Sequence, residues 1–355
     1  MLQIADLRVL LPTPRGQAAA LRGIHFDVAR GEAVGLIGES GCGKSMTALA
    51  LMGLLPTGAE VTGSIRLDGQ ELVGLDDAAM CVLRGDRIGR VFQEPMTALN
   101  PLHAVGHQVA EPLRLHRGMG RTQARAEALR LLDRVQLPQA AQRLDAYPHQ
   151  LSGGQRQRVT IAMALACGPD LLIADEPTTA LDVTIQGEIL DLIHELVRDS
   201  DMALLMISHD LGVMARMVTR LLVMYGGSVV ESGPTAEVFA HLAHPYTRGL
   251  YGARPRLGAP RVNGRKARLA TIPGRVPELV DMPAGCPFAD RCEWMIDACR
   301  AGPPAAVEVG PDHEARCIRL DALGAPATSP SAAPPQAGLD PLRGSVAARG
   351  GRGAP

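Results

Sequence analysis

Short apolar runs recur along the chain, and several of them end at a polar residue. Residues 33–37, 171–174 and 203–207 are apolar or alanine, and each run is long enough for a buried strand. Asp175 and Glu176 follow the second run, His209 closely follows the third, and Gln93 follows a shorter apolar segment at 91–92. Short apolar runs bounded by turn signals are typical of buried parallel strands. The pattern therefore predicts an α/β fold whose parallel strands carry polar residues at their carboxyl ends.

Other segments of the chain have a helical repeat or a biased composition. Residues 122–137 have the repeat of an amphipathic helix, with Ala128, Leu131, Leu132 and Val135 on one face. The Pro/Gly/Arg-rich segment 253–268 is typical of a solvated linker. Residues 321–355 are rich in Ala, Pro, Gly and Ser and poor in large apolar residues, which predicts a disordered tail. We therefore expect a large domain over 1–252 and a small one over 269–320.

Composition and charge restrict the classes of function. With 355 residues and a net charge of −1, the chain can bury a large core but offers no electrostatic attraction to nucleic acid or to an anionic membrane. Its apolar runs, such as 202–207, are too short to cross a bilayer, and the N-terminal residues do not resemble a signal peptide. Any work at a membrane would therefore be peripheral. In the reducing compartment that this implies, the seven cysteines favour metal binding or free thiols over disulfides.

The most informative motif is the glycine-rich turn after the first of these runs. Residues Gly38–Ser45, GESGCGKS, match the phosphate-binding pattern G-x-x-x-x-G-K-[ST]. Backbone amides and the start of a helix near Lys44 would hold phosphate oxygens, Lys44 would reach the β- and γ-phosphates, and Ser45 would ligate Mg²⁺. A glycine-rich turn without a ligand is the alternative. The candidate ATP-binding residues here are Gly38, Glu39, Ser40, Gly41, Cys42, Gly43, Lys44, Ser45 and Met46.

Two further segments suit phosphoryl transfer. Asp175 could hold the magnesium shell and Glu176 could position or deprotonate the attacking water. In LSGGQRQR, residues 151–158, Ser152 can cap a helix whose Gly153 and Gly154 amides could bind an anion, although an ordinary capped helix is the alternative. A phosphate loop and a second anion-binding helix start in one chain suggest a composite site between two subunits.

In their order and spacing these elements resemble an ABC-transporter ATPase subunit. Gly38–Ser45 matches the Walker A loop, residues 151–155 the ABC signature, and residues 171–176 Walker B with its catalytic glutamate. The resemblance implies a P-loop NTPase fold with a RecA-like core, an antiparallel β subdomain and a helical subdomain. It also implies that two such subunits close head-to-tail around two ATP molecules, each offering residues to its partner's nucleotide. Those residues in trans would be Ser152, Gly153, Gly154, Gln155 and Asp182.

The same resemblance assigns further roles. Gln93 matches the Q-loop, where its amide would contact the magnesium shell and the water, and His209 matches the switch histidine, which would contact the γ-phosphate. The catalytic set is then Lys44, Gln93, Glu176 and His209. In the family an aromatic residue near the first strand usually stacks on adenine, whereas this chain offers Leu10 and Leu11 in the matching region. We therefore expect a weaker apolar contact with the base.

The spacing of the motifs and three sequence segments narrow the choice among ABC proteins. The 107 residues between Lys44 and Ser152 leave no room for the coiled coil of DNA-repair members, and ribosome-acting members carry two cassettes where this chain has one phosphate loop. Residues 91–111, 174–186 and 244–250 resemble the dipeptide/oligopeptide/nickel importer ATPases. That resemblance implies peptide import powered at the cytoplasmic face of the membrane, with nickel or another small solute as the alternative. It also implies a second, different ATPase subunit, two transmembrane permease subunits and, indirectly, an external solute-binding protein; nucleic acid is not expected as a partner.

Four of the cysteines cluster near the end of the chain. Cys286, Cys292, Cys299 and Cys317 are separated by five, six and seventeen residues, which does not match the close C-x-x-C pairs of zinc ribbons. Four thiolates can hold a [4Fe–4S] cluster or one Zn²⁺, and four free thiols are the remaining alternative. Residues 269–320 resemble the C-terminal extension of peptide-importer ATPases, in which some members are understood to carry such a cluster. The resemblance favours iron–sulfur over zinc.

Overall fold

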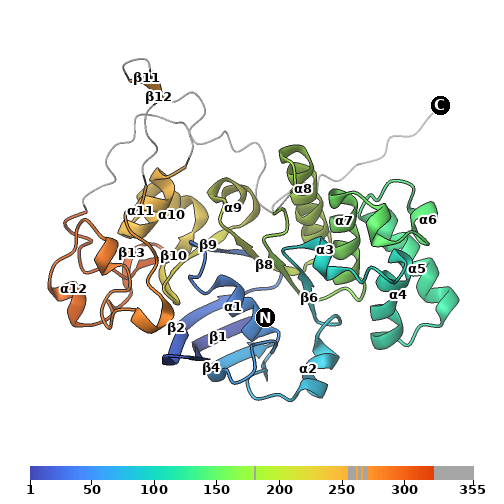
Figure 1. The fold of residues 1–355 in the computed structure, drawn as a ribbon, viewed down its shortest axis with the longest axis horizontal. Coiled ribbons are helices and arrows are strands. Elements are labelled where there is room, and N and C mark those ends of the chain that lie inside the picture. The colour runs from blue at the N-terminus through green and yellow to red at the C-terminus, as the bar shows by residue number, and fades with distance from the viewer. Residues whose placement is uncertain (180, 255–260, 263–264, 267–270, 324–355) are drawn as a thin grey trace, which may run out of the picture.

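A mixed eight-stranded sheet forms the centre of the protein (Figure 1). The computed structural model describes residues 1–179, 181–254, 261–262, 265–266 and 271–323. The strand order is β13-β14-β10-β9-β3-β8-β7-β6, and the stretch from β9 to β6 is parallel. The strands are β3 (Ala33–Ile37), β6 (Ile88–Val91), β7 (Leu171–Asp175), β8 (Ala203–Ser208), β9 (Arg220–Tyr225), β10 (Ser228–Pro234), β13 (Val307–Gly310) and β14 (His313–Ala315). Strands β3, β7 and β8 are buried along their whole length, which explains their continuous apolar runs.

A second sheet of four antiparallel strands packs beside α1 (Lys44–Leu51). Its order is β2-β1-β4-β5, with β1 (Leu2–Thr13), β2 (Gly16–Val28), β4 (Glu60–Leu67) and β5 (Gln70–Glu71). Apolar residues alternate with exposed ones along β1, so one face of this sheet is buried. A further hairpin pairs β11 (Arg261–Val262) with β12 (Arg265–Lys266).

Helices between β6 and β7 form a separate lobe (Figure 1). The amphipathic pattern predicted over 122–137 corresponds to α5 (Arg121–Arg134), which buries Ala128, Leu131 and Leu132, and buried Val135 caps its end. The other helices of this lobe are α3 (Pro95–Ala98), α4 (Val105–His116), α6 (Ala140–Arg143), η1 (Pro148–Gln150) and α7 (Gly153–Ala164). The parallel core, the antiparallel sheet and this helical lobe confirm the predicted ABC ATPase fold.

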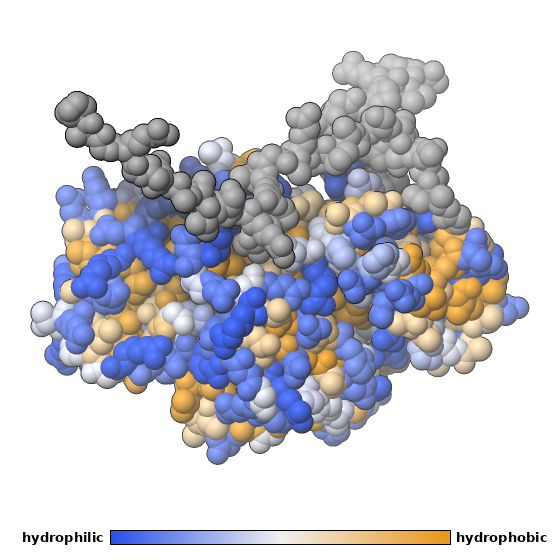
Figure 2. Space-filling model, turned by 180° about the vertical axis from the view of Figure 1, so that it is seen from behind, coloured by the Kyte–Doolittle hydropathy of each residue, from blue (hydrophilic) through white to orange (hydrophobic). Residues whose placement is uncertain are grey.

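The remaining helices lie around the two sheets or within the C-terminal segment. They are α2 (Asp77–Leu83), α8 (Val183–Ser200), α9 (Leu211–Met217), α10 (Thr235–His241), α11 (Pro245–Gly252), η2 (Leu279–Asp281), η3 (Ala289–Arg291) and α12 (Ala298–Ala301). In the part of the chain that the structure describes, no helix is long and apolar enough to cross a membrane. On the face seen from behind, polar side chains alternate with apolar ones (Figure 2).

The C-terminal segment from residue 271 to 323, here called the extension, is joined to the core sheet. Strand β14 pairs with β10, and His313 Nε2 of β14 lies 2.9 Å from Glu231 Oε1 of β10 in a fully buried hydrogen bond. Phe288 packs edge-on against Tyr225 of the core. These contacts fix the extension against the core sheet. Much of the predicted linker 253–268 and nearly all of the predicted tail 321–355 lie outside the described residues.

Candidate nucleotide-binding site

The phosphate loop connects β3 to α1, which begins at Lys44 as the sequence predicts. Gly38 has a φ of +157°, and a Cβ built there would lie 2.3 Å from the carbonyl oxygen of Met224, so glycine is required. The Lys44 Nζ donates to the carbonyl oxygens of Gly38 at 2.7 Å and Glu39 at 3.0 Å. The ammonium is therefore held over the loop, where it can neutralise phosphate oxygens.

Asp175 ends β7 beside the first turn of α1. Its Oδ1 accepts a hydrogen bond from the Ser45 hydroxyl at 3.3 Å, and its Oδ2 lies 2.8 Å from Arg90 Nη2. Asp175 is 3% exposed, and the buried Arg90 guanidinium compensates its charge. The Ser45 hydroxyl and the Asp175 carboxylate therefore lie next to each other, and the Gln93 side-chain amide lines the same pocket as Ser45. Oxygen donors of this kind fit Mg²⁺.

Side chains from the ends of three parallel strands meet at Glu176. Its Oε2 accepts from Gln93 Nε2 at 3.2 Å and from the Thr179 hydroxyl at 2.9 Å, and its Oε1 lies 3.2 Å from His209 Nδ1. Glu176 has a φ of +47°, an uncommon left-handed conformation for a residue with a Cβ. Its partners and the bond from its backbone amide to Ile207 hold it there. Strain of this kind is common at active sites.

One open pocket with a cavity volume of about 360 Å³ joins these groups, and this volume lies within the usual range of ligand pockets. Its lining is Ala20, Ser40, Gly41, Gly43, Lys44, Ser45, Met46, Gln93, Glu176, His209 and Leu279. Asp175 lies behind Ser45. Two residues of the phosphate loop turn their side chains elsewhere: Cys42 is fully buried in the core, and Glu39 binds Arg291 of the extension. These two residues can therefore offer backbone groups to phosphate, but their side chains are engaged outside the pocket.

The residues expected to act in trans lie at two helix starts. Ser152 caps α7 by accepting from the Gln155 amide at 3.3 Å, and the Gln155 side chain accepts from the Ser152 amide at 3.1 Å. Asp182 caps α8 in the same way, at 3.0 Å from the Ile185 amide. Gly154 packs so closely on α8 that an added Cβ would lie 2.7 Å from Ile185 Cγ2, whereas Gly153 is exposed. None of these predicted residues lines the pocket described for their own chain.

Three further residues at this site belong to no recognisable sequence motif. Arg90 is an isolated charge in the short strand β6. A charged residue inside an apolar strand is the one sequence signal that it has a buried partner, here Asp175. Ala20 lies in β2, and Leu279 lies in the extension, more than 200 residues beyond the phosphate loop. No local pattern connects Ala20 or Leu279 to a nucleotide.

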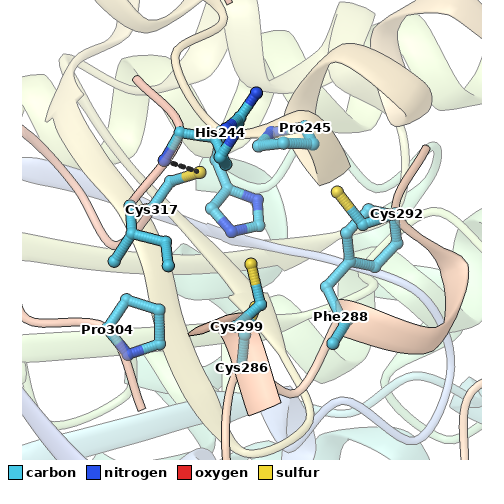
Figure 3. A pocket seen from close by; sticks show the side chains of 11 residues that line it. His244, Pro245, Cys286, Phe288, Cys292, Cys299, Pro304 and Cys317 are labelled. Carbon is cyan, nitrogen blue, oxygen red and sulfur yellow. Dashed lines mark hydrogen bonds between the residues drawn. The ribbon is translucent and has the colours of Figure 1, made fainter. Parts of the chain in front are cut away.

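The four clustered cysteines line one small pocket of the extension, beside the His244 ring (Figure 3). Pro245, Phe288, Pro304 and Ile318 contribute apolar walls. Burial, and to a smaller extent charge on the other three cysteines, raises the pKa of the Cys286 thiol to about 11. Burial likewise raises the pKa of Cys292 and of Cys317. Within the described ranges, however, no three His, Cys, Asp or Glu side chains are grouped closely enough to hold a metal ion.

Comparison with known proteins identifies the family. The family model described as "ABC transporter" matches residues 21–179, and the one described as "Oligopeptide/dipeptide transporter, C-terminal region" matches residues 230–299. A protein of Brucella melitensis named as a peptide import ATP-binding protein is 50% identical over 92% of this chain and 98% of its own length. The oligopeptide transport ATP-binding protein OppD of Salmonella typhimurium is 47% identical over 86% of this chain and 89% of its own length.

A solved structure agrees with these matches. The dimeric ATP-binding cassette MJ0796 bound to ADP and Pi superimposes with a TM-score of 0.60 and 32% identity, covering 66% of this chain and 99% of that one. The relatives and the cassette confirm the resemblance drawn from Gly38–Ser45 and the motifs that follow it. The chain belongs to the ABC transporter family of ATPases and carries the C-terminal region of its oligopeptide/dipeptide branch.

Proposed function

We propose that this protein binds and hydrolyses ATP to energise an importer of dipeptides or oligopeptides, acting at the cytoplasmic face of the membrane. The observation that carries the ATPase activity is the convergence of Gln93, Glu176 and His209 in the pocket that contains Lys44. The names of the Brucella and Salmonella relatives support peptide as the solute. Nickel or another small solute is the second candidate, because the resemblance in the sequence extends to nickel importers.

The side chains have separate tasks in this proposal. Glu176 polarises the water that attacks the γ-phosphate, and His209 and Gln93 hold that water in line. Lys44 and the loop amides stabilise negative charge on the transferring group. Ser45, Gln93 and Asp175 would hold Mg²⁺, which when bound neutralises charge on the phosphate oxygens. The position of Glu176 between the other two side chains suits this division of work.

We propose that the active unit is a dimer with a second, different ABC ATPase subunit. Ser152, Gly153, Gly154, Gln155 and Asp182 would then face the partner's nucleotide. Of the two permease subunits, one would dock a helix or loop on this chain, beside Gln93 and the helical lobe. Phe92 next to Gln93 is 42% exposed, and Leu102 between α3 and α4 is 81% exposed. Exposed large apolar side chains of this kind favour a protein partner. An external solute-binding protein would act through the permeases.

The test of the ATPase proposal is Glu176→Gln, with Glu195→Gln at an exposed position of α8 as the matched control. We expect Glu176→Gln to bind ATP with unchanged affinity, to lose at least about a hundredfold in turnover, and to accumulate a closed dimer. Calorimetry measures ATP affinity, steady-state phosphate release with the partner subunit present measures turnover, and light scattering detects the closed dimer. Turnover within threefold of the wild type would contradict the proposal, and so would an equal loss in Glu195→Gln.

We also propose that Cys286, Cys292, Cys299 and Cys317 hold a [4Fe–4S] cluster, with Zn²⁺ as the alternative. In the described ranges these thiols are not grouped closely enough for a metal ion, so they would have to approach one another on binding. Their shared pocket and its apolar walls support a buried group, and several buried thiolates need a cation to ionise together. Anaerobically purified protein should contain about four iron atoms per chain and absorb near 400 nm. Cys299→Ser should lose both signals, while Cys81→Ser, at an exposed position in α2, should keep them. One zinc per chain would establish the alternative, and metal-free protein would reject both.

A further inference from the structure

One residue of the nucleotide pocket comes from the extension. Leu279 is the first residue of η2, and it lines the same pocket as Lys44, Ser45 and His209. Its side chain is half-buried and packs against the core that also contacts Leu11 and Met46. Leu279 therefore adds an apolar surface to a pocket whose other walls are mostly glycine and polar side chains.

Contacts on one side tie the Leu279 segment to the hairpin of β1 and β2. Arg15, between these strands, forms two hydrogen bonds with Asp281, at 2.5 Å and 2.8 Å, and lies 3.4 Å from Glu278. Arg22 of β2 donates to the carbonyl oxygen of Pro283 at 3.3 Å. The segment is thus fixed against the same hairpin that carries Leu11.

A second anchor ties the extension to the phosphate loop. Arg291 Nη1 and Nη2 donate to the Glu39 carboxylate at 2.5 Å and 3.1 Å, and its Nε donates to the carbonyl oxygen of Pro273 at 2.8 Å. The Arg291 side chain is 5% exposed. Since Leu279 lies in the chain between Pro273 and Arg291, the wall that it forms is held from both ends.

The adenine base needs an apolar surface, and in the described part of the chain no Phe, Tyr or Trp lines the pocket. We propose that the extension completes the nucleotide site of its own subunit, with Leu279 as the apolar wall for the purine base. The proposal rests on ATP binding by this chain. Leu279 contacts ring surface and offers no hydrogen bond to the edges of the base, so it adds affinity for purine nucleotides without distinguishing adenine from guanine.

Calorimetry on the full chain separates base contact from phosphate contact. MgATP and magnesium tripolyphosphate, which has no base, are titrated into the wild type, Leu279→Ala, Leu279→Phe and the exposed extension control Val307→Ala. We expect Leu279→Ala to bind ATP about tenfold more weakly and tripolyphosphate within twofold of the wild type, because only contact with the base is lost. Leu279→Phe should bind ATP at least as tightly as the wild type, since an aromatic ring can stack on the base.

Two results would overturn the proposal: equal ATP affinity in Leu279→Ala and Val307→Ala, or an equal loss of ATP and tripolyphosphate in Leu279→Ala. Photolabelling of the wild type with 8-azido-ATP gives a second measurement that needs no variant. The label should appear in the tryptic peptide 276–291, and label confined to peptide 9–15, which contains Leu11, would overturn the proposal. Failure of the wild type to bind ATP at all would instead reject the proposed function.

Discussion

Replacement of Arg291 by Met tests how strongly the extension is held to the phosphate loop. Methionine keeps the length and the apolar stem of the side chain but removes the guanidinium, which bonds to Glu39, Pro273 and Tyr225. The hydrogen bond to Glu39 is the main cause of the raised pKa of Arg291, so the cation is fully charged at any working pH. The change therefore removes one charge and several hydrogen bonds from a side chain that is 5% exposed.

The free energy lost in Arg291→Met depends on how well water can solvate Glu39 once the pair is broken. Breaking a fully buried ion pair costs about 3–5 kcal/mol because the remaining charge is left unpaired in the interior. Glu39 is 30% exposed and recovers part of its hydration, so we expect the lower end, about 3 kcal/mol. At about 1.4 kcal/mol for each factor of ten, the opening equilibrium of the extension should rise by about a hundredfold.

Native-state hydrogen exchange read by mass spectrometry measures this opening directly, over the amides of residues 276–291. The matched control is Arg300→Met, because Arg300 pairs with Asp290 at 2.9 Å in the same extension but with about half of each side chain exposed. That pair should contribute less than about 1 kcal/mol. A double-mutant cycle with Glu39→Gln should give a coupling of about 2 kcal/mol. Additivity of Arg291→Met and Glu39→Gln within about 0.5 kcal/mol, or equal exchange in both arginine variants, would refute the reasoning.

Two other predictions concern single residues. Burial lowers the pKa of His244 to about 4, so between pH 6.5 and that value the unfolded chain binds a proton that the folded chain does not, and stability falls as the pH falls. Metal-free protein should lose about 1.6 kcal/mol from this group between pH 6.5 and pH 5, and His244→Asn, which can still cap α11 at the Tyr246 amide, should lack this loss in urea unfolding. Gly154→Ala should cost about 1–3 kcal/mol because its Cβ meets Ile185 at 2.7 Å, whereas Gly153→Ala, with ordinary contact at 3.5 Å, should change the melting temperature little.

The parallel core and its catalytic corner could be predicted because the signals are local. A run such as residues 171–174 is apolar because β7 is buried on both faces, and the residues that follow it must lie at the carboxyl edge of the sheet. Glu176 and His209 end adjacent parallel strands, so they meet whatever the intervening loops do. The glycines of Gly38–Ser45 allow the backbone conformation of a phosphate-binding loop, so the motif predicts that conformation by itself.

The side-chain directions within the phosphate loop could not be predicted in the same way. The motif specifies a path for the backbone, and it leaves the residues between the glycines free to face either side. Cys42 turns into the core, and Glu39 turns toward an arginine 252 positions away in the sequence. Leu279 poses the same difficulty, because its role depends on how the extension packs over β2. Contacts between segments so far apart leave no periodic trace in one sequence.

Arg291 also connects two sites that the sequence treats as separate. Cys292, which lines the cysteine pocket, follows it directly, and Phe288 of the same turn packs on both Tyr225 and that pocket. The short 3₁₀ helix Ala289–Arg291 therefore binds the phosphate loop through its last residue, and a thiol of the cysteine pocket follows directly. Since packed interiors transmit small shifts instead of absorbing them, we expect a change in the geometry of the cysteine pocket to shift the position of Glu39. Leu279 and Arg291 thus place the extension against the nucleotide pocket and its phosphate loop.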